Sequence, residues 1–122
     1  MPAKILVVED NAPNRELLSF LLHRDGYAVL EAENGNEAVE IARYNKPDLI
    51  LMDIQMPVMD GVTAMKTLKS SPETSAIRII AVTSFAMKGD REKALASGFD
   101  GYVAKPIDTR AFPGQIRNFL AE

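Results

Sequence analysis

The amino-acid sequence predicts an α/β fold, a doubly wound parallel sheet that helices cover on both faces. Short apolar or β-branched runs alternate with segments of helical period from one end of the chain to the other. The first, third and fourth of these runs are almost continuously apolar, as expected for strands that are buried on both faces. Strict alternation of strand and helix favours right-handed crossovers and therefore a parallel sheet.

Five segments are predicted as strands, and all of them are short and rich in aliphatic residues. In chain order they are residues 4–8, 28–32, 49–52, 78–82 and 101–104. With five strands in this alternation we expect the flavodoxin-like order 2-1-3-4-5, in which the first and third strands are neighbours. Ligands of such sheets bind at the carboxyl ends of the strands, where the strand order reverses.

Helices are predicted between the strands because apolar residues recur there at helical spacing. The apolar positions are Leu17, Leu18, Leu21 and Leu22, then Ala38, Ile41 and Ala42, then Met65 and Leu68, then Ala94 and Leu95, and finally Phe112, Ile116, Phe119 and Leu120. Turn-forming pairs bound these segments at Asp25-Gly26, Asn34-Gly35, Asp60-Gly61 and Ser97-Gly98. In the last segment, Pro113 and Gly114 disfavour a helix interior, so we expect irregular structure over residues 109–113. Either the helix begins late, with Pro113 in its first turn, or its start is distorted.

The composition indicates one globular domain, residues 1–122, with 47% hydrophobic and 25% charged residues. A net charge of -3 gives no general attraction to nucleic acid or to anionic membranes. The chain has no cysteine, which excludes disulfides and thiolate chemistry and fits a reducing compartment. No apolar run approaches the roughly 20 residues of a membrane span, so a cytoplasmic protein is expected.

Polar side chains stand where four of the five predicted strands end. They are Glu9 and Asp10 after the first strand, Asp53 after the third, Thr83 after the fourth and Lys105 after the fifth. Because all of these ends lie at one edge of a parallel sheet, we expect three carboxylates, a hydroxyl and an ammonium group to converge there.

Such a cluster of acids needs a cation, because like charges about 4 Å apart repel by about 4 kcal/mol at an effective dielectric constant near 20. Lys105 offsets part of this charge, and an oxygen-only ligand set suits Mg²⁺. His23, the only histidine, is predicted at the far end of the first helix. With a cation in place, an anionic phosphoryl donor can approach and an aspartate can act as nucleophile, while Thr83 and Lys105 are suited to hold phosphoryl oxygens.

Four stretches carry a resemblance to a known family: "ILVVEDN", "PDLILMDIQMPVMDG", "IIAVTSFAMKGD" and "GFDGYVAKPI". In this order and spacing, the chain resembles the CheY-like receiver domain of two-component response regulators from its first strand to its last helix. The run "SFAMKGD" is similar to that of the single-domain DivK-like kind, although receivers of hybrid kinases carry similar runs. The chain is therefore either a whole single-domain receiver or a domain from a larger protein.

The resemblance implies a role for each residue of the site. It implies that Asp53 is the phosphoacceptor and that Thr83 and Lys105 bind the phosphoryl group. It implies that Mg²⁺ is bound by Asp10, Asp53 and the backbone carbonyl of Gln55, with Glu9 acting through water. It also implies that Tyr102 is the switching aromatic and that the peptide bond before Pro106 is cis. It also implies a histidine kinase or histidine phosphotransfer protein as donor and a downstream protein as target. The face that changes would be built from the fourth helix, the fifth strand and the fifth helix. Such a module is not an enzyme beyond its own phosphorylation and dephosphorylation.

Three other classes stay open on the sequence alone. A phosphohydrolase of the haloacid dehalogenase type needs a second acid two residues after the nucleophile, where this chain has Gln55. A flavodoxin-like flavin carrier needs a Ser/Thr/Gly-rich phosphate loop after the first strand, where this chain has the acidic run "EDNAPN". A degenerate receiver used as a constitutive scaffold is disfavoured because every expected site residue is present.

Overall fold

Five parallel strands form one central sheet in the order β2-β1-β3-β4-β5, which confirms the predicted order. The computed structural model describes residues 2–54, 60–83 and 89–121. The strands are β1 (Lys4–Val8), β2 (Ala28–Ala32), β3 (Leu49–Asp53), β4 (Arg78–Thr83) and β5 (Gly101–Ala104). β3 and β4 each extend one residue beyond the predicted end, so Asp53 and Thr83 belong to strands and inherit their fixed backbone geometry.

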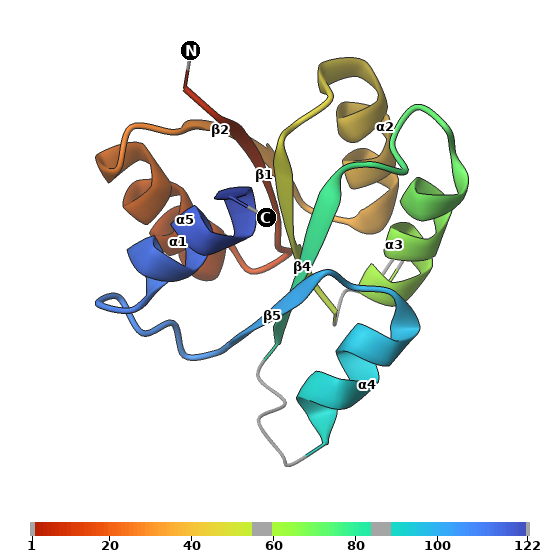
Figure 1. The fold of residues 1–122 in the computed structure, drawn as a ribbon. Helices are drawn as coiled ribbons and strands as arrows, with labels where there is room; N and C mark the ends of the chain where they lie inside the picture. The colour runs from red at the N-terminus through yellow and green to blue at the C-terminus, as the bar shows by residue number, and fades with distance from the viewer. Residues whose placement is uncertain (1, 55–59, 84–88, 122) are drawn as a thin grey trace.

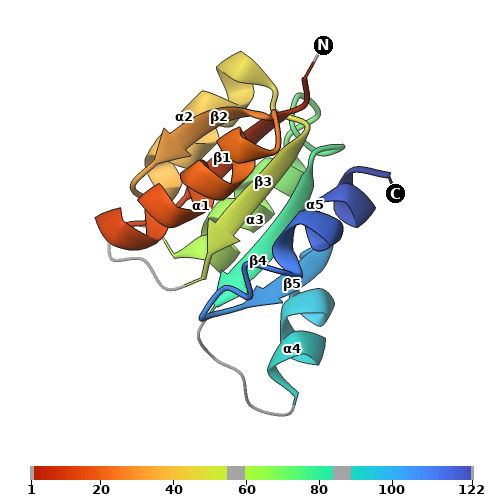
Figure 2. The ribbon, with the colours of Figure 1, turned by 90° about the vertical axis from the view of Figure 1, so that its left-hand side faces the viewer.

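Helices cover both faces of the sheet (Figures 1 and 2). α1 (Ala12–Arg24) and α5 (Phe112–Ala121) lie on one face, and α2 (Gly35–Asn45), α3 (Gly61–Ser70) and α4 (Asp90–Ser97) lie on the other. β1, β3 and β4 are central and are buried along almost their whole length, whereas β2 and β5 form the two edges. The continuous apolar runs of the three central strands follow from this position between two layers.

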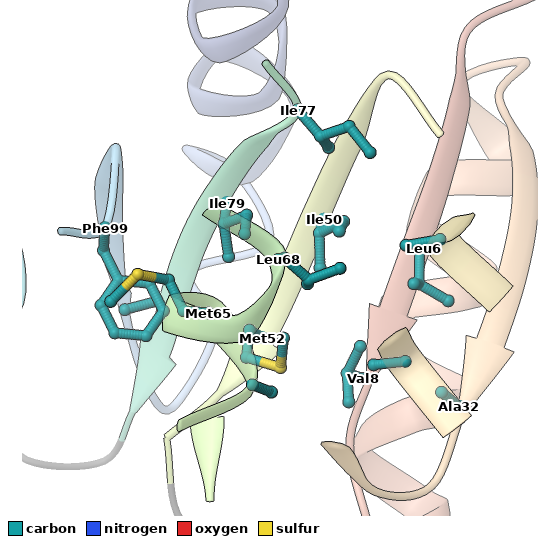
Figure 3. Packing of buried hydrophobic residues seen from close by; sticks show 14 of the residues in the cluster. Leu6, Val8, Ala32, Ile50, Met52, Met65, Leu68, Ile77, Ile79 and Phe99 are labelled. Atoms are coloured by element: carbon teal, nitrogen blue, oxygen red, sulfur yellow. The ribbon is translucent and has the colours of Figure 1, made fainter. Parts of the chain in front are cut away.

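Alternating residues of each strand supply two separate hydrophobic clusters. On the α2–α3–α4 side, Leu6, Ile50 and Ile79 pack with Met65 and Leu68 of α3 (Figure 3). On the other side, a second cluster joins the sheet to α1 and α5; it contains Ile5, Val7, Leu49, Leu51, Leu18, Leu22, Phe112 and Ile116. Burying one such side chain contributes about 1.5–3 kcal/mol, so both layers hold the central strands firmly.

Side-chain caps fix where three of the helices begin. Asn11 accepts a hydrogen bond from the backbone of Asn14 at 3.0 Å, and Asn34 and Asp60 cap α2 and α3 in the same way. Two of the four turn-forming pairs, at residues 34–35 and 60–61, are therefore helix starts. The pair at residues 97–98 ends α4, where Gly98 has a φ of 124°, a region that favours glycine.

The helix α5 begins late with Pro113 in its first turn, which is one of the two alternatives that the Pro113-Gly114 pair left open. Residues 109–111 form a turn, and Pro113 is the second residue of the helix, where a missing backbone N–H leaves no intrahelical bond unmade. The irregular segment ends at residue 111 rather than 113, because proline is compatible with the first helical turn.

Two residues of the predicted apolar stripes lie outside the core. Leu17 on α1 is 38% exposed and Leu95 on α4 is 40% exposed. Helical spacing alone could not separate them from their buried neighbours, because each lies at the border of its helix's buried face. None of the helices in the described part of the chain combines the length and the hydropathy that a bilayer crossing requires.

Candidate functional site

Three carboxylates meet at the carboxyl end of the sheet. β1 and β3 are neighbours with Val8 opposite Met52, so Glu9 and Asp10 leave β1 beside Asp53, the last residue of β3. One carboxylate oxygen from each of the three acids lies within 4.8 Å of the others. The convergence predicted from strand order is therefore present in the fold.

The three acids differ in their exposure to water. Glu9 is 1% exposed and Asp53 is 5% exposed, whereas Asp10 is exposed at the rim of the site. The backbone N–H of Glu9 donates to the carbonyl oxygen of Ala32 in β2, which places Glu9 as a continuation of the strand. The acidic cluster is therefore open to water on the side of Asp10 and closed on the side of Glu9 and Asp53.

Lys105 brings a positive charge into this acidic pocket from the end of β5. Its ammonium group binds Glu9 Oε1 and lies 3.3 Å from Asp53 Oδ2. Its backbone N–H donates to the carbonyl oxygen of Thr83 at 2.8 Å, and the Lys105–Pro106 peptide bond is cis, the isomer that the family resemblance implies. The ammonium is thus in contact with the first and third strands while its backbone is tied to the fourth.

The site shifts the pKa values of Glu9 and Lys105. Burial is the main cause that raises the pKa of Glu9, and the Asp53 carboxylate raises it further against the lowering effect of Lys105. Burial lowers the pKa of Lys105, but its bonds and attractions to Glu9 and Asp53 outweigh burial, so the net shift is upward. The upward shift of Lys105 reflects the two carboxylates around its ammonium group, whereas the shift of Glu9 reflects mainly its burial.

The donor set fits a hard divalent cation. Glu9 Oε2 is buried and has no hydrogen-bond partner among the described residues, although a buried carboxylate oxygen is costly to leave unpaired. Asp10 and Asp53 offer further oxygens within reach of the same point. Oxygen-only coordination at an open rim is typical of Mg²⁺, which keeps part of its water shell. Gln55, the expected carbonyl ligand, lies outside the described residues.

Gly61 packs closely against the backbone of Asp53. The N–H of Gly61, at the start of α3, donates to the carbonyl oxygen of Ile54 at 3.0 Å. A Cβ atom at residue 61 would lie 2.3 Å from the backbone oxygen of Asp53 and 2.9 Å from the Cα of Ile54. The sequence indicated Gly61 only as part of a turn; its close approach to the end of β3 depends on tertiary packing that local spacing cannot reveal.

Thr83 and Tyr102 lie on the neighbouring strands β4 and β5. Thr83 is buried at the end of β4 opposite Ala104, and Tyr102 stands opposite Ala81, two residue pairs earlier along the same two strands. A cavity of about 170 Å³ adjoins Thr83, and its other walls are formed by side chains of α3 and α4 together with Ile54 and Phe99. Tyr102 is half-buried against the α2–α3–α4 cluster and also lines a groove on the side of α4 and α5.

Comparison with known proteins agrees with this geometry. The family model described as "Response regulator receiver domain" matches residues 5–117. The chain is 43% identical over 122 residues to the polar-differentiation response regulator DivK of Brucella anthropi, covering 100% of this chain and 99% of that protein. DivK of Brucella ovis is 41% identical with the same coverage.

Several solved structures share the overall fold of this chain. A putative response regulator from Chloroflexus aurantiacus superposes with a TM-score of 0.94 at 29% identity, with 100% of both chains covered. The receiver domain of sensor histidine kinase PA1611 from Pseudomonas aeruginosa, solved with magnesium in its active site cleft, gives 0.91 at 33% identity with 100% of both chains covered. Chemotaxis protein CheY4 of Vibrio cholerae gives 0.89 at 27% identity, with 98% of this chain and 99% of that chain covered.

The family match excludes two of the three classes that the sequence left open, since a flavin carrier or a phosphohydrolase would not match this model over nearly the whole chain. A degenerate receiver belongs to the same family, so the match does not address that third class. The fold, the polar residues at the strand ends and the sequence identity to known receivers all support the same assignment. The chain belongs to the family of response regulator receiver domains, which are signalling modules switched by phosphorylation.

Proposed function

We propose that Asp53 is the phosphoacceptor of this receiver and that Lys105 and Thr83 bind the phosphoryl group. The observation that carries the proposal is the meeting of Glu9, Asp10 and Asp53 with the ammonium group of Lys105 at one end of the sheet. Asp53 ends a fully buried strand, so its backbone is held while its carboxylate faces the pocket that Asp10 opens to water.

The transfer is a displacement at phosphorus. An Asp53 oxygen attacks the phosphorus of a phosphohistidine, a P–O bond forms, and the P–N bond breaks with its electron pair left on the imidazole nitrogen. Lys105 attracts the phosphoryl oxygens, and the Thr83 hydroxyl donates a hydrogen bond to them. Hydrolysis restores the aspartate when water attacks the same phosphorus and orthophosphate leaves. Both steps are reactions of the module on itself, which makes it a signalling protein rather than an enzyme with a separate substrate.

We propose Mg²⁺ as the cofactor, held by Asp10, Asp53 and the backbone carbonyl of Gln55, with Glu9 acting through water. The unpaired, buried Glu9 Oε2 and the three converging carboxylates support this assignment. The magnesium in the active site cleft of the related Pseudomonas receiver supports it by analogy. When bound, the ion supplies positive charge that lets an anionic phosphoryl donor enter an acidic pocket.

The signal leaves the site through Thr83 and Tyr102. Movement of Thr83 toward the phosphoryl oxygens would vacate space that the Tyr102 ring enters, which changes the face formed by α4, β5 and α5. A groove on this face is lined by Tyr102 together with Leu95 and Phe119, so the face that changes is also one that a protein can contact. We propose a histidine kinase or a histidine phosphotransfer protein as the donor and a downstream protein as the target.

Intact mass spectrometry tests the proposal directly. Incubation with acetyl phosphate and Mg²⁺ should add the mass of one phosphoryl group, and the gain should disappear in Asp53→Asn and in the presence of a chelator. Asp25→Asn is the matched control, because Asp25 ends α1 and its one described ion pair is with Arg24. A phosphoryl gain that survives Asp53→Asn would contradict the assignment. No gain from acetyl phosphate or from a phosphorylated histidine phosphotransfer protein would leave the constitutive scaffold as the better reading.

A further inference from the structure

Arg15 lies against the backbone of the acidic pocket. It belongs to the first turn of α1, and its side chain is only 12% exposed. Its Nη1 group donates to the carbonyl oxygen of Glu9 at 2.8 Å. A nearly buried arginine that binds the main chain of a site residue is a candidate for controlling the shape of that site.

The bond from Arg15 completes the pairing of the Glu9 backbone. The N–H of Glu9 donates to Ala32 at 3.0 Å, and its carbonyl accepts from Arg15. The carbonyl belongs to the peptide unit that joins Glu9 to Asp10, so fixing its direction fixes the planar group from which both acids extend. The plane from which these two neighbouring side chains extend is therefore held by Arg15 through the main chain.

Two acids at the end of β2 hold the guanidinium group of Arg15 in place. Its Nε lies 3.4 Å from Glu31 and its Nη2 lies 3.4 Å from Glu33, and both acids belong to β2 or the turn after it. Glu31 is held in turn by Ser19 of α1, whose hydroxyl donates to Glu31 Oε2 at 2.8 Å. A planar guanidinium with several donors can serve these acceptors at once, which a lysine ammonium cannot do with the same geometry.

We propose that Arg15 is a positioning residue for the cation site, holding the Glu9–Asp10 peptide unit in the orientation that binds Mg²⁺. The proposal rests on the proposed function of the pocket. Without Arg15, the mutually repelling carboxylates can rotate apart when no cation is bound, and binding must then restore their geometry. Loss of a group that orients a metal ligand typically lowers metal affinity about 10–100-fold, and we expect a loss in this range for Arg15→Met.

Magnesium titration of the folded protein separates this role from a merely structural one. Isothermal titration calorimetry of wild type, Arg15→Met and Arg15→Lys should give the tightest binding for wild type, intermediate binding for Lys, which keeps one donor for the Glu9 carbonyl, and the weakest for Met. Arg24→Met is the matched control, because Arg24 lies in the last turn of the same helix and pairs only loosely with Asp25 at 3.8 Å. Its Mg²⁺ affinity should equal that of wild type.

Two further measurements keep the test decisive. Urea unfolding with a chelator present gives the stability of each variant without Mg²⁺, so titrations are compared only where the protein is folded. If Arg15→Met does not fold, Glu31→Gln replaces it; this variant leaves Arg15 in place with a weaker anchor, and a smaller loss of affinity in the same direction is expected. Backbone amide NMR shifts of residues 9 and 10 in the Mg²⁺-free protein should move in each variant that binds more weakly.

The outcomes distinguish this inference from the function on which it rests. Wild type that binds Mg²⁺ while the Arg15 and Glu31 variants bind equally well would overturn the role of Arg15 and leave the proposed site intact. Wild type that shows no Mg²⁺ binding would overturn the proposed cofactor and this inference with it. A graded loss across the variants, with Arg24→Met unaffected, supports the assignment.

Discussion

The backbone N–H of Lys105 donates to the carbonyl oxygen of Thr83 at 2.8 Å, so the two proposed phosphoryl ligands are joined through their main chains. The bond continues the parallel pairing of β4 with β5 one step past the end of β5, where Thr83 stands opposite Ala104. A displacement of Thr83 is therefore coupled to the segment that carries Lys105. A displacement at the site can therefore be transmitted directly to β5, the edge strand that also carries Tyr102.

Replacing Gly61 by alanine should destabilise the protein by about 1–3 kcal/mol, the usual range for overpacking. The added Cβ would overlap the backbone oxygen of Asp53, which has no room to move in a fully buried strand. Urea unfolding measures the stability, and the rate of phosphorylation by acetyl phosphate should fall because Asp53 is displaced.

Gly114→Ala is the matched control for this substitution. Gly114 is helical, and a Cβ there would meet only the end of the Arg117 side chain, at an ordinary distance of 3.7 Å. Alanine in place of a helical glycine stabilises by about 0.5–1 kcal/mol, so the two variants should shift the unfolding midpoint in opposite directions. Equal shifts would show that the close approach of Gly61 to Asp53 is unimportant.

Replacing Lys105 by methionine should lower the stability of the Mg²⁺-free protein at neutral pH. The substitution leaves the buried carboxylates of Glu9 and Asp53 without their ammonium partner, and an uncompensated buried charge is strongly unfavourable. Added Mg²⁺ should restore more stability to Lys105→Met than to wild type. Thermal unfolding with and without Mg²⁺ checks this, and Lys4→Met, which removes an ammonium from an exposed bond at the opposite end of β1, should respond to Mg²⁺ as wild type does.

The raised pKa of Glu9 predicts how the stability of the Mg²⁺-free protein depends on pH. The folded state holds a proton on Glu9 more tightly than the unfolded state, whose glutamate has the ordinary pKa of 4.5. The contribution of Glu9 is therefore fully present below pH 4.5 and is lost as the pH rises through the raised folded value. Urea unfolding should show that the free energy of unfolding falls as the pH rises through this window, and that Glu9→Gln removes the fall. The same dependence on pH in Glu9→Gln as in wild type would contradict the prediction.

Replacing Tyr102 by alanine should uncouple phosphorylation from the α4–β5–α5 face. Asp53 should still accept the phosphoryl group, because Tyr102 is not among the acids or the lysine that meet there. The amide NMR shifts that phosphorylation induces in α4 and α5 should shrink, while those next to Asp53 persist. Tyr44→Ala, at a side chain that is 84% exposed on α2, should leave both sets unchanged. Full-sized shifts in α4 and α5 of Tyr102→Ala would refute the aromatic switch.

Much of the site could be predicted because it follows from strand order. Apolar runs identify buried strands, and the carboxyl ends of parallel strands share one edge, so the positions of Glu9, Asp53 and Lys105 relative to each other follow from topology. The helix-disfavouring Pro113-Gly114 pair likewise indicated that the start of α5 would be unusual, whereas the cis bond before Pro106 was expected from the family resemblance and not from local sequence. The role of each residue in phosphorylation came from family resemblance and stays a prediction.

Contacts between elements could not be read from spacing. The approach of Gly61 to Asp53 and the bond from Arg15 to the Glu9 carbonyl both depend on how a helix end packs against a strand end. On sequence alone, Arg15 is one more charged residue on an amphipathic helix. The exposure of Leu17 shows the same limit, because helical period gives a face but not where its border lies.

The ion pair between Lys105 and Glu9 joins residues 96 positions apart, and the contact with Asp53 spans 52 positions. A ribosome-bound chain that has emerged only as far as β4 therefore holds all three acids without their lysine. Under the proposed function, such a chain also lacks one of the two phosphoryl ligands, so the complete site forms only after the last strand has been synthesised.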